Sequence, residues 1–474
     1  MVEIVLPMGP TSRPRGMRGG TVWRQGPGQG RLLMRTMLVL IGLAPLPLGS
    51  NRPFFWGLSA LVIGVTLLVW ARANQRNRVR PSPGLAALRL QGWLFGLFVM
   101  FLVLQMLPIG PWLGGLAGAG LEGMGVVPQT ISLAPGNTLL MLLRQLTYAA
   151  FFFLMLQVAS RDNQRSKSMD VLLAVITGYA VVGLASLQMG DTILGLQKWA
   201  YQGSATGTFV NRNSYATFLA FGAVLAMTQL VDRLGLWADR EEGGLRQSLP
   251  EVVLYSSALL LILAAVVSSQ SRMGFVVTLC GMLTVVVLAV LRNRRLLQGA
   301  LIIVGLGFVV VLCLLLAYGE GLLGRIDVLE KSSSVRLALY GQVLELIALR
   351  PWAGFGGGAF ELAFPLVHQL PVSGDAVWDK AHNSYLALWS EMGIFAGSIP
   401  MIMLALMGLR VFSALLAKRG SWRAQTVALG AIVVGAVHST VDFSLEIQAD
   451  TLMFLALIAL GYAATLKSGK EKSR

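Results

Sequence analysis

The chain is poor in charge, cysteine and histidine. Only 13% of its 474 residues are charged, and it holds two cysteines and three histidines. A soluble protein of this length carries roughly twice that share of charged residues. Cys280 and Cys313 both lie within apolar runs, without the loop context of a disulfide or of a cysteine metal site. These shortages exclude a soluble domain and a disulfide framework.

Hydrophobic residues make up 55% of the sequence and gather into long runs. Runs of about 17–25 residues have the length that crosses a bilayer, and in lipid each must be a helix because its backbone groups need internal partners. We therefore predict an all-α polytopic membrane protein with one transmembrane domain at residues 33–466. Twelve transmembrane helices are expected, at about residues 33–50, 53–71, 88–107, 138–159, 169–189, 213–231, 252–270, 273–291, 297–317, 383–409, 424–440 and 449–466. The first contains Pro45 and Pro47 and is expected to be kinked or short.

The Lys and Arg residues give these helices an orientation. The formal net charge is +16, and most Lys and Arg fall in segments that are cytoplasmic when the N-terminus is cytoplasmic. Basic runs such as 72–80 are then anchors beside anionic lipid, and no nucleic-acid partner is expected. Residues 1–32 and 467–474 are predicted to be cytoplasmic tails. The first is basic, is expected to be disordered, and lacks the apolar core of a signal peptide.

The outer side carries the longest polar segment, at about residues 318–382. An apolar stripe within it predicts an interfacial helix lying on the outer leaflet. The stripe consists of Val335, Leu339, Val343, Leu346 and Ile347. Residues 108–137, which are rich in Gly and Pro, are expected to form a re-entrant or interfacial cover.

Two arginines on this side stand among small polar residues. Arg212 lies between Asn211 and Asn213, an arrangement that suits an anionic or sugar-bearing ligand. A helix cap with an arginine reaching the interface is the alternative. Arg272 follows Ser271 in a hairpin with almost no loop, where a cation must find an anion, carbonyl groups or the outer headgroups.

A glycine-rich segment follows at residues 354–360. Glycines such as Gly356 and Gly358 let backbone amides approach a ligand closely, as phosphate cradles do. A flexible turn is the alternative interpretation of the same residues.

His382 lies where the long outer segment meets an apolar run, with Asn383 as a predicted helix N-cap. A neutral imidazole at a helix N-terminus, beside a phosphate ester, can act as a general base. A hydrogen-bonded interfacial histidine is the alternative. His438 and Asp442 are four residues apart, so a helix would place them on one face, and both a structural and a catalytic role remain open for this pair.

The outer segments contain no Asp-x-Asp, His-x-x-x-His or cysteine cluster, so we expect neither a metal nor a cofactor. Arginines would neutralise a diphosphate instead of a metal ion.

Taken in order, the outer motifs resemble the O-antigen ligase and Wzy-type polymerase family over about residues 135–450. The motifs are Gly207-Thr208-Phe209-Val210-Asn211-Arg212-Asn213, Ser271-Arg272-x-Gly274, Ser334-Val335-Arg336, Pro351-x-x-Gly354-x-Gly356-x-Gly358-x-Phe360 and His382-Asn383-Ser384-Tyr385-Leu386 with Glu391-x-Gly393.

The resemblance implies a C-type glycosyltransferase fold in the bacterial inner membrane. It further implies transfer of a glycan from undecaprenyl diphosphate to an acceptor sugar on the periplasmic face, without metal or nucleotide sugar. The acceptor would be lipid A core or a growing polysaccharide. The essential arginines and histidine of the family fall on Arg272, Arg336 and His382. Ser214 follows Asn213 where many relatives have histidine, so no base is assigned there.

In this interpretation Arg272 and Arg336 bind the diphosphate and His382 takes the proton of the acceptor hydroxyl. Asn211, Arg212 and Asn213 would help to position the donor, while Gly356, Gly358 and Asn383 would contact substrate. Tyr385, Trp352 and Trp378 would stack on sugars, and anchoring at the membrane interface is the alternative for these aromatic residues.

The alternatives are a twelve-span transporter and a flippase for lipid-linked glycans. Transporters place ionisable groups within their spans, and here only Arg144 clearly lies inside a predicted one. Whether the chain is a ligase, a polymerase or a protein glycan transferase stays open.

Overall fold

The computed structural model describes residues 27–121, 125, 128–238, 244–292, 326–375 and 377–466. Among these residues, nine helices are long and apolar enough to cross a membrane. The prediction of an all-α polytopic membrane protein is therefore confirmed as a fold class. Within the described part of the chain, the strands are limited to the short antiparallel pair β1 (Thr192–Ile193) and β2 (Leu196–Gln197).

Every predicted transmembrane run except 297–317, which lies outside the described residues, coincides with a helix. These helices are α1 (Pro27–Leu43), α2 (Pro53–Arg76), α3 (Arg89–Met106), α6 (Pro135–Ala159), α7 (Asp162–Gln188), α8 (Arg212–Ala238), α9 (Gly244–Ser268), α10 (Arg272–Arg292), α15 (Ser384–Leu416), α16 (Trp422–His438) and α17 (Gln448–Leu466). At 17 residues each, α1 and α16 are the shortest of them. As expected, α1 ends before Pro45 and Pro47.

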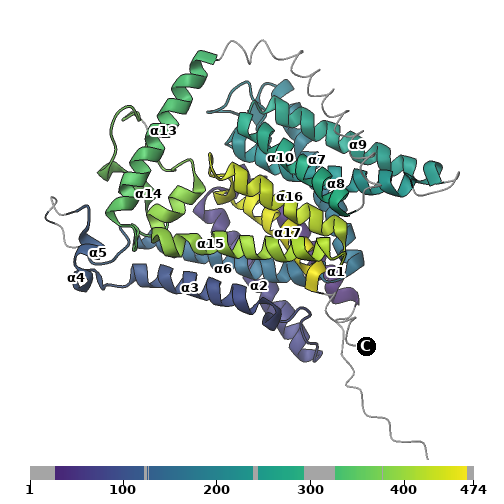
Figure 1. Ribbon diagram of the computed structural model, residues 1–474, viewed down its shortest axis with the longest axis horizontal. Helices are drawn as coiled ribbons and strands as arrows, with labels where there is room; N and C mark the ends of the chain where they lie inside the picture. The colour runs from purple at the N-terminus through teal and green to yellow at the C-terminus, as the bar shows by residue number, and fades with distance from the viewer. Residues whose placement is uncertain are drawn as a thin grey trace, which may run out of the picture.

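Short elements fill the connections. They are η1 (Leu48–Ser50), η2 (Leu85–Leu88), α4 (Gly110–Leu113), α5 (Gly115–Gly118), α14 (Phe360–Ala363), η4 (Phe364–Leu366) and η5 (Ser444–Glu446). The longer α13 (Ile326–Leu349) lies at the end of the bundle where α15 begins, beside α14 (Figure 1).

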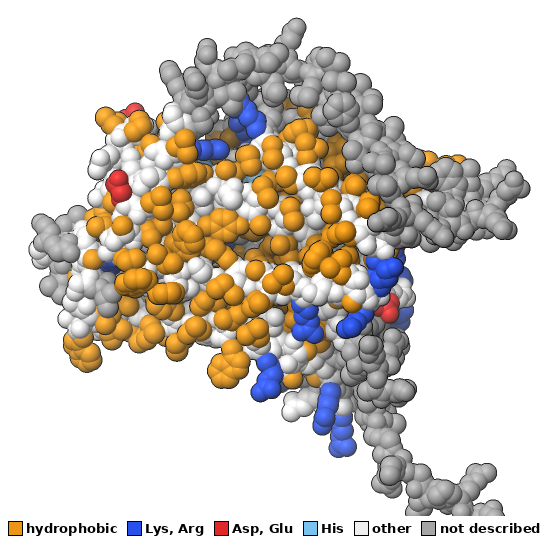
Figure 2. Space-filling view, viewed as in Figure 1, with side chains coloured by type: hydrophobic (Ala, Val, Ile, Leu, Met, Phe, Trp, Pro, Cys, Tyr) orange, Lys and Arg blue, Asp and Glu red, His pale blue; other side chains and the backbone are white. Residues whose placement is uncertain are grey.

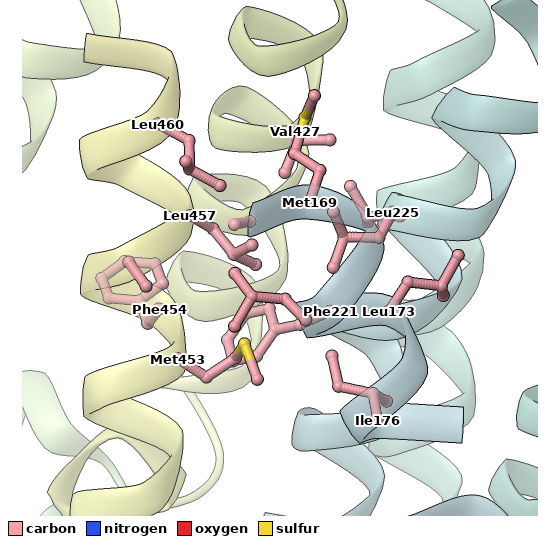
Figure 3. Packing of buried hydrophobic residues seen from close by; sticks show 14 of the residues in the cluster. Met169, Leu173, Ile176, Phe221, Leu225, Val427, Met453, Phe454, Leu457 and Leu460 are labelled. Atoms are coloured by element: carbon pink, nitrogen blue, oxygen red, sulfur yellow. The ribbon is translucent and has the colours of Figure 1, made fainter. Parts of the chain in front are cut away.

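The centre of the bundle is α8, whose most apolar stretch is entirely buried. It packs against α7, α9, α10, α16 and α17, and Figure 3 shows Phe221 and Leu225 of α8 between Met169 of α7 and Met453 of α17. Glycines permit this close packing. A Cβ atom on Gly281 of α10 would lie 2.7 Å from a Val224 methyl carbon, which is too close for a side chain.

The outer surface of the bundle is apolar where lipid is expected. Figure 2 shows hydrophobic side chains over most of the described surface in this view, with Lys and Arg mainly at the lower right. Phe54, Leu68, Trp93 and Phe395 are examples of large side chains that stay exposed on this shell. Such a surface is what a membrane-embedded bundle requires.

The structure corrects the prediction for the apolar stripe of α13. Leu339, Val343 and Leu346 are fully buried in a cluster that includes Phe355 and Phe364. The stripe therefore faces protein and not the outer leaflet. An apolar helical face is stabilised by any surroundings that exclude water, whether lipid or protein. Here the segment that follows α13 covers this face.

Candidate active site

Asp442, in the turn between α16 and α17, lies at the junction of several polar side chains. Its carboxylate is almost fully buried, with Oδ1 3.8 Å from Nδ1 of His382 and Oδ2 3.9 Å from Nδ1 of His438. Asn213 donates from its side-chain amide to Oδ1 at 3.3 Å, and the Ser444 hydroxyl donates to Oδ2 at 2.7 Å. One buried carboxylate thus joins α8, α16 and the segment that leads into α15.

The surroundings of Asp442 keep it ionised. Burial by itself raises the pKa of this carboxyl group, but His382, His438 and Ser444 outweigh burial and hold the pKa below its ordinary value of 3.8. Asp442 is therefore a carboxylate at neutral pH, and two histidine rings face it.

His382 is held from several sides. Its main-chain carbonyl accepts a hydrogen bond from the Tyr340 hydroxyl at 2.9 Å, and its ring lies edge-on to Phe443 and Trp378, with centroids 5.1 and 6.2 Å away. Its φ of 49° is in the left-handed region, a conformation that costs a residue with a side chain roughly 1–2 kcal/mol. The surrounding contacts hold this conformation in place.

The two ring nitrogens of His382 lie in different environments. Nδ1 is buried and faces Asp442, whereas the side chain as a whole is 28% exposed. Part of the ring other than Nδ1 is therefore accessible.

Asn383 begins α15 as predicted. Its Oδ1 accepts hydrogen bonds from the amides of Tyr385 at 3.0 Å and Leu386 at 3.1 Å, so the N-cap prediction is confirmed. Its side-chain amide donates to the Thr440 carbonyl at 2.9 Å, and the Tyr385 hydroxyl donates to the Ala436 carbonyl at 2.8 Å. These contacts fix the start of α15 against the end of α16.

Of residues 211–213, Asn211 caps α8, whereas the side chains of Arg212 and Asn213 contact residues outside this helix. Asn211 accepts from the Asn213 amide at 2.7 Å and caps α8. The Asn213 side chain connects Asp442 to the hairpin before α10, because its Oδ1 accepts from the Ser271 hydroxyl at 2.8 Å. The Arg212 guanidinium lies 5.3 Å from the ring centroid of Tyr201.

The positive charge of Arg336, on α13, acts on two tyrosines that the Asp442 charge also affects. Burial raises the pKa of Tyr201, the Asp442 charge adds to this, and Arg212 and Arg336 oppose it. Burial likewise raises the pKa of Tyr340, where Arg336 again opposes Asp442. The charges of Arg212 and Arg336 thus act on tyrosines that the Asp442 charge also affects, and the convergence of these arginines with His382 stays a prediction.

Arg272 is connected to this group less directly. It is exposed at the first residue of α10 and directly follows Ser271, which binds Asn213. Its side chain makes no hydrogen bond or ion pair with the described residues. Its convergence with His382 stays a prediction.

The glycine-rich segment has a different role from the one expected. The Gly356 amide donates to the Glu391 carbonyl at 2.9 Å and the Gly357 amide to Oε1 of Gln105 at 3.2 Å. The amides of Gly358 and Phe360 donate to the Glu391 carboxylate. The acceptor in this cradle is thus the protein's own Glu391 side chain, and contact of Gly356 and Gly358 with substrate stays a prediction.

Close backbone contact explains why glycines occupy this region. Gly354 and Gly393 have φ of 63° and 70°. A Cβ atom on Gly393 would lie 2.3 Å from the Trp352 carbonyl oxygen, and one on Gly354 would lie 2.3 Å from the Glu391 carbonyl oxygen. The segment after α13 therefore docks directly onto the backbone of α15.

Sequence reasoning left the role of Asp442 open and missed Tyr340 and Glu446. Glu446 pairs with Lys380 at 2.9 Å, and its charge raises the pKa of Lys380. The four-residue spacing of His438 and Asp442 was the only sequence signal for this part of the site. Among the described residues, no group of three or more His, Cys, Asp and Glu could hold a metal ion.

A search of curated proteins found no match to the chain. Residues 257–401 match the family model described as O-antigen ligase. This range contains Arg272, Arg336 and His382, whereas Asn213 and Asp442 lie outside it. The match confirms the predicted resemblance to the O-antigen ligase family over residues 257–401.

Proposed function

We propose that the protein is a bacterial inner-membrane glycosyltransferase of the O-antigen ligase or polysaccharide polymerase type. It transfers a glycan from undecaprenyl diphosphate to an acceptor sugar on the periplasmic face. The observation that carries this proposal is the placement of Nδ1 of His382 against the buried Asp442 carboxylate. The matched domain supplies the class of reaction.

Asp442 gives His382 the properties of a general base. A carboxylate that faces Nδ1 favours the tautomer with its proton on that nitrogen and stabilises the imidazolium that forms later. The lone pair of Nε2 is then free to accept a proton. A protonated imidazole has no free lone pair on Nε2 and could not accept this proton. The Asp442 carboxylate contributes by orienting the ring and by its negative charge.

Arginines would stabilise the leaving group. Arg212 and Arg336 act on the same part of the site, and Arg272 stands next to Ser271 beside it. Guanidinium groups bind phosphate oxygens through paired, charge-assisted hydrogen bonds. Two or three of them neutralise a diphosphate without a metal ion.

The reaction follows from these positions. The acceptor hydroxyl oxygen attacks the anomeric carbon of the donor glycan and forms the new glycosidic bond. The bond between that carbon and the diphosphate oxygen breaks, and undecaprenyl diphosphate leaves with the electron pair. The hydroxyl proton passes to Nε2 of His382.

The topology proposed with this function has twelve spans, residues 297–317 included, and both termini in the cytoplasm. Residues 318–382 then form a periplasmic segment. The starts of α8, α10 and α15 and the end of α16 meet at the site, which agrees with a position on one face of the membrane.

Arg144, the ionisable residue predicted to lie inside a span, has a structural explanation. Its guanidinium donates to the Glu446 carbonyl and to the Tyr148 hydroxyl, and lies 4.3 Å from the Trp56 ring centroid. It therefore ties α6 to α2 and to η5, and its place within a span does not require transport.

The proposal is tested by giving the purified protein, in nanodiscs, undecaprenyl-diphosphate glycan and an acceptor glycolipid. We expect transfer that persists in EDTA. Failure of transfer with several donor and acceptor pairs, or loss in EDTA with recovery in magnesium, would contradict the proposal.

A further inference from the structure

A second polar feature lies at the end of the bundle away from the His382 group. It is a pocket of about 460 Å³ between α1 and α7, near the starts of both helices, and is here called the basic pocket. Figure 1 shows the start of α1 at the end of the bundle away from α13. The 27 residues of α7 lead over roughly 40 Å from this pocket toward the segment before α8. In the topology proposed above, the basic pocket lies on the cytoplasmic side.

The lining of the basic pocket carries an excess of positive charge. Four cationic side chains, two amides and Met34 line it, namely Arg31, Arg35, Arg161 and Lys167 with Asn163 and Gln164. Within the described part of the chain, no acidic side chain lines it. The carboxylate next to Arg161 in the sequence, Asp162, pairs with Arg165, and neither of these two lines the pocket. Counting that pair leaves the excess unchanged, so the pocket attracts an anion.

Close contact between the two helices builds the pocket. A Cβ atom on Gly30 of α1 would overlap the Arg161 guanidinium and would lie 3.0 Å from Nε2 of Gln164. The glycine therefore lets both side chains cross the start of α1. The Gln164 side chain is buried, and its Oε1 has no hydrogen-bond partner among the residues that the structure describes. The lining thus offers an unused acceptor for a hydroxyl group beside cations that bind phosphate.

The helix surfaces that continue from the basic pocket into the membrane are apolar. On α1, Val39 and Leu43 follow Arg35 at intervals of four residues, which places them on one face, and both are exposed. On α7, Val171 follows Lys167 at the same interval and is exposed as well. The stretch from Arg35 to Leu43 spans roughly 12 Å, close to the depth of one leaflet. Acyl chains can therefore lie against these faces while their headgroup occupies the pocket, and a soluble phosphate would gain nothing from them.

We propose that the basic pocket binds the phosphate diester of an anionic glycerophospholipid, whose acyl chains lie along α1 and α7. Guanidinium and ammonium groups bind the phosphate oxygens, and Oε1 of Gln164 accepts from a hydroxyl of the headgroup. General attraction of basic segments to an anionic membrane needs no particular residue, whereas this site depends on the residues that line it. The inference does not rest on the proposed function.

Two of the lining cations can be removed with little effect on folding. Arg35 and Lys167 are exposed, and their side chains make no hydrogen bond or ion pair with the described residues. The double variant Arg35→Gln with Lys167→Gln therefore removes charge from the pocket alone. The matched control is Arg72→Gln with Arg76→Gln, because these cations are equally exposed near the end of α2, on the same side in the proposed topology, but do not line the pocket.

The probe is phosphatidylglycerol with a photoreactive group in one acyl chain, added to the full-length protein in detergent micelles. We expect labelled peptides from α1 and α7. The concentration that gives half-maximal labelling should rise at least roughly fivefold in the pocket variant, since each lost cation weakens attraction to anionic lipid, and should be unchanged in the control variant. Excess unlabelled phosphatidylglycerol should suppress the labelling, whereas phosphatidylcholine with the same acyl chains and glycerol 3-phosphate should not.

Labelling of the pocket variant at the wild-type concentration, or an equal loss in the pocket and control variants, would overturn the proposal, because the headgroup would then not be held by the lining residues. Labelled peptides from helices other than α1 and α7 would overturn it as well. Suppression by phosphatidylcholine would indicate a site for acyl chains alone, and suppression by glycerol 3-phosphate a site for a soluble phosphate, and either result contradicts the proposal. The assay contains no glycan donor or acceptor, so its outcome is independent of the proposed function.

Discussion

Asn213 donates a hydrogen bond to the Asp442 carboxylate across 3.3 Å, although 229 residues separate the two in the sequence. The same carboxylate faces His382. The start of α8 and the turn before α17 are thereby fixed to each other. The His382 imidazole is oriented by Asp442, a residue that lies outside both the motif around Asn213 and the motif around His382.

The first prediction concerns this carboxylate. Asp442→Asn keeps the shape of the side chain but removes the charge that favours the proton on Nδ1 of His382. We expect single-turnover transfer to fall by roughly 10²–10⁴-fold, with donor affinity changed little. Asp375→Asn, at an exposed position, is the control. Transfer by Asp442→Asn at the wild-type rate would remove Asp442 from the mechanism.

The second prediction is a pH dependence of stability. The pKa of Asp442 is lower in the folded protein than its ordinary value of 3.8. A depressed pKa means that the contribution of Asp442 to stability is present above the unfolded value and is lost as pH falls through the folded one. The thermal stability advantage of wild type over Asp442→Asn should therefore shrink as pH falls below about 4. An advantage that grows toward low pH would contradict this.

The third prediction separates donor binding from proton transfer. Arg336→Lys replaces a planar fork by a point charge, and we expect the donor Kd to rise roughly tenfold, the effect of about 1.4 kcal/mol. Arg410→Lys is the control, because Arg410 contacts Tyr462 between α15 and α17 and not the site. Unchanged donor affinity in Arg336→Lys would show that Arg336 does not bind the diphosphate.

The fourth prediction tests the docking of the glycine-rich segment. Gly393→Ala forces a Cβ atom against the Trp352 carbonyl oxygen at a φ of 70°. Strain of this kind costs about 1–3 kcal/mol, so the melting temperature should fall. Gly341→Ala, in a helix with open space around it, should leave stability equal or higher. Equal stability of Gly393→Ala and wild type would contradict the described contact.

The sequence patterns predicted local structure better than the site. Apolar runs located the described transmembrane helices, and Asn383 was identified as an N-cap because capping depends on residues only two or three positions away. The cradle around Glu391 and the burial of Leu339 could not be predicted in this way. Both depend on how the segment after α13 docks onto α15, a contact between distant parts of the chain. The role of Asp442 likewise appears only when α8, α15 and α16 come together.

The most direct test of the central claim is single-turnover transfer by His382→Ala, measured with saturating donor and acceptor beside a separate measurement of donor binding. We predict that transfer falls by roughly 10²–10⁴-fold and that donor affinity stays at the wild-type value. Transfer by His382→Ala at the wild-type rate would show that His382 is structural and would contradict the mechanism.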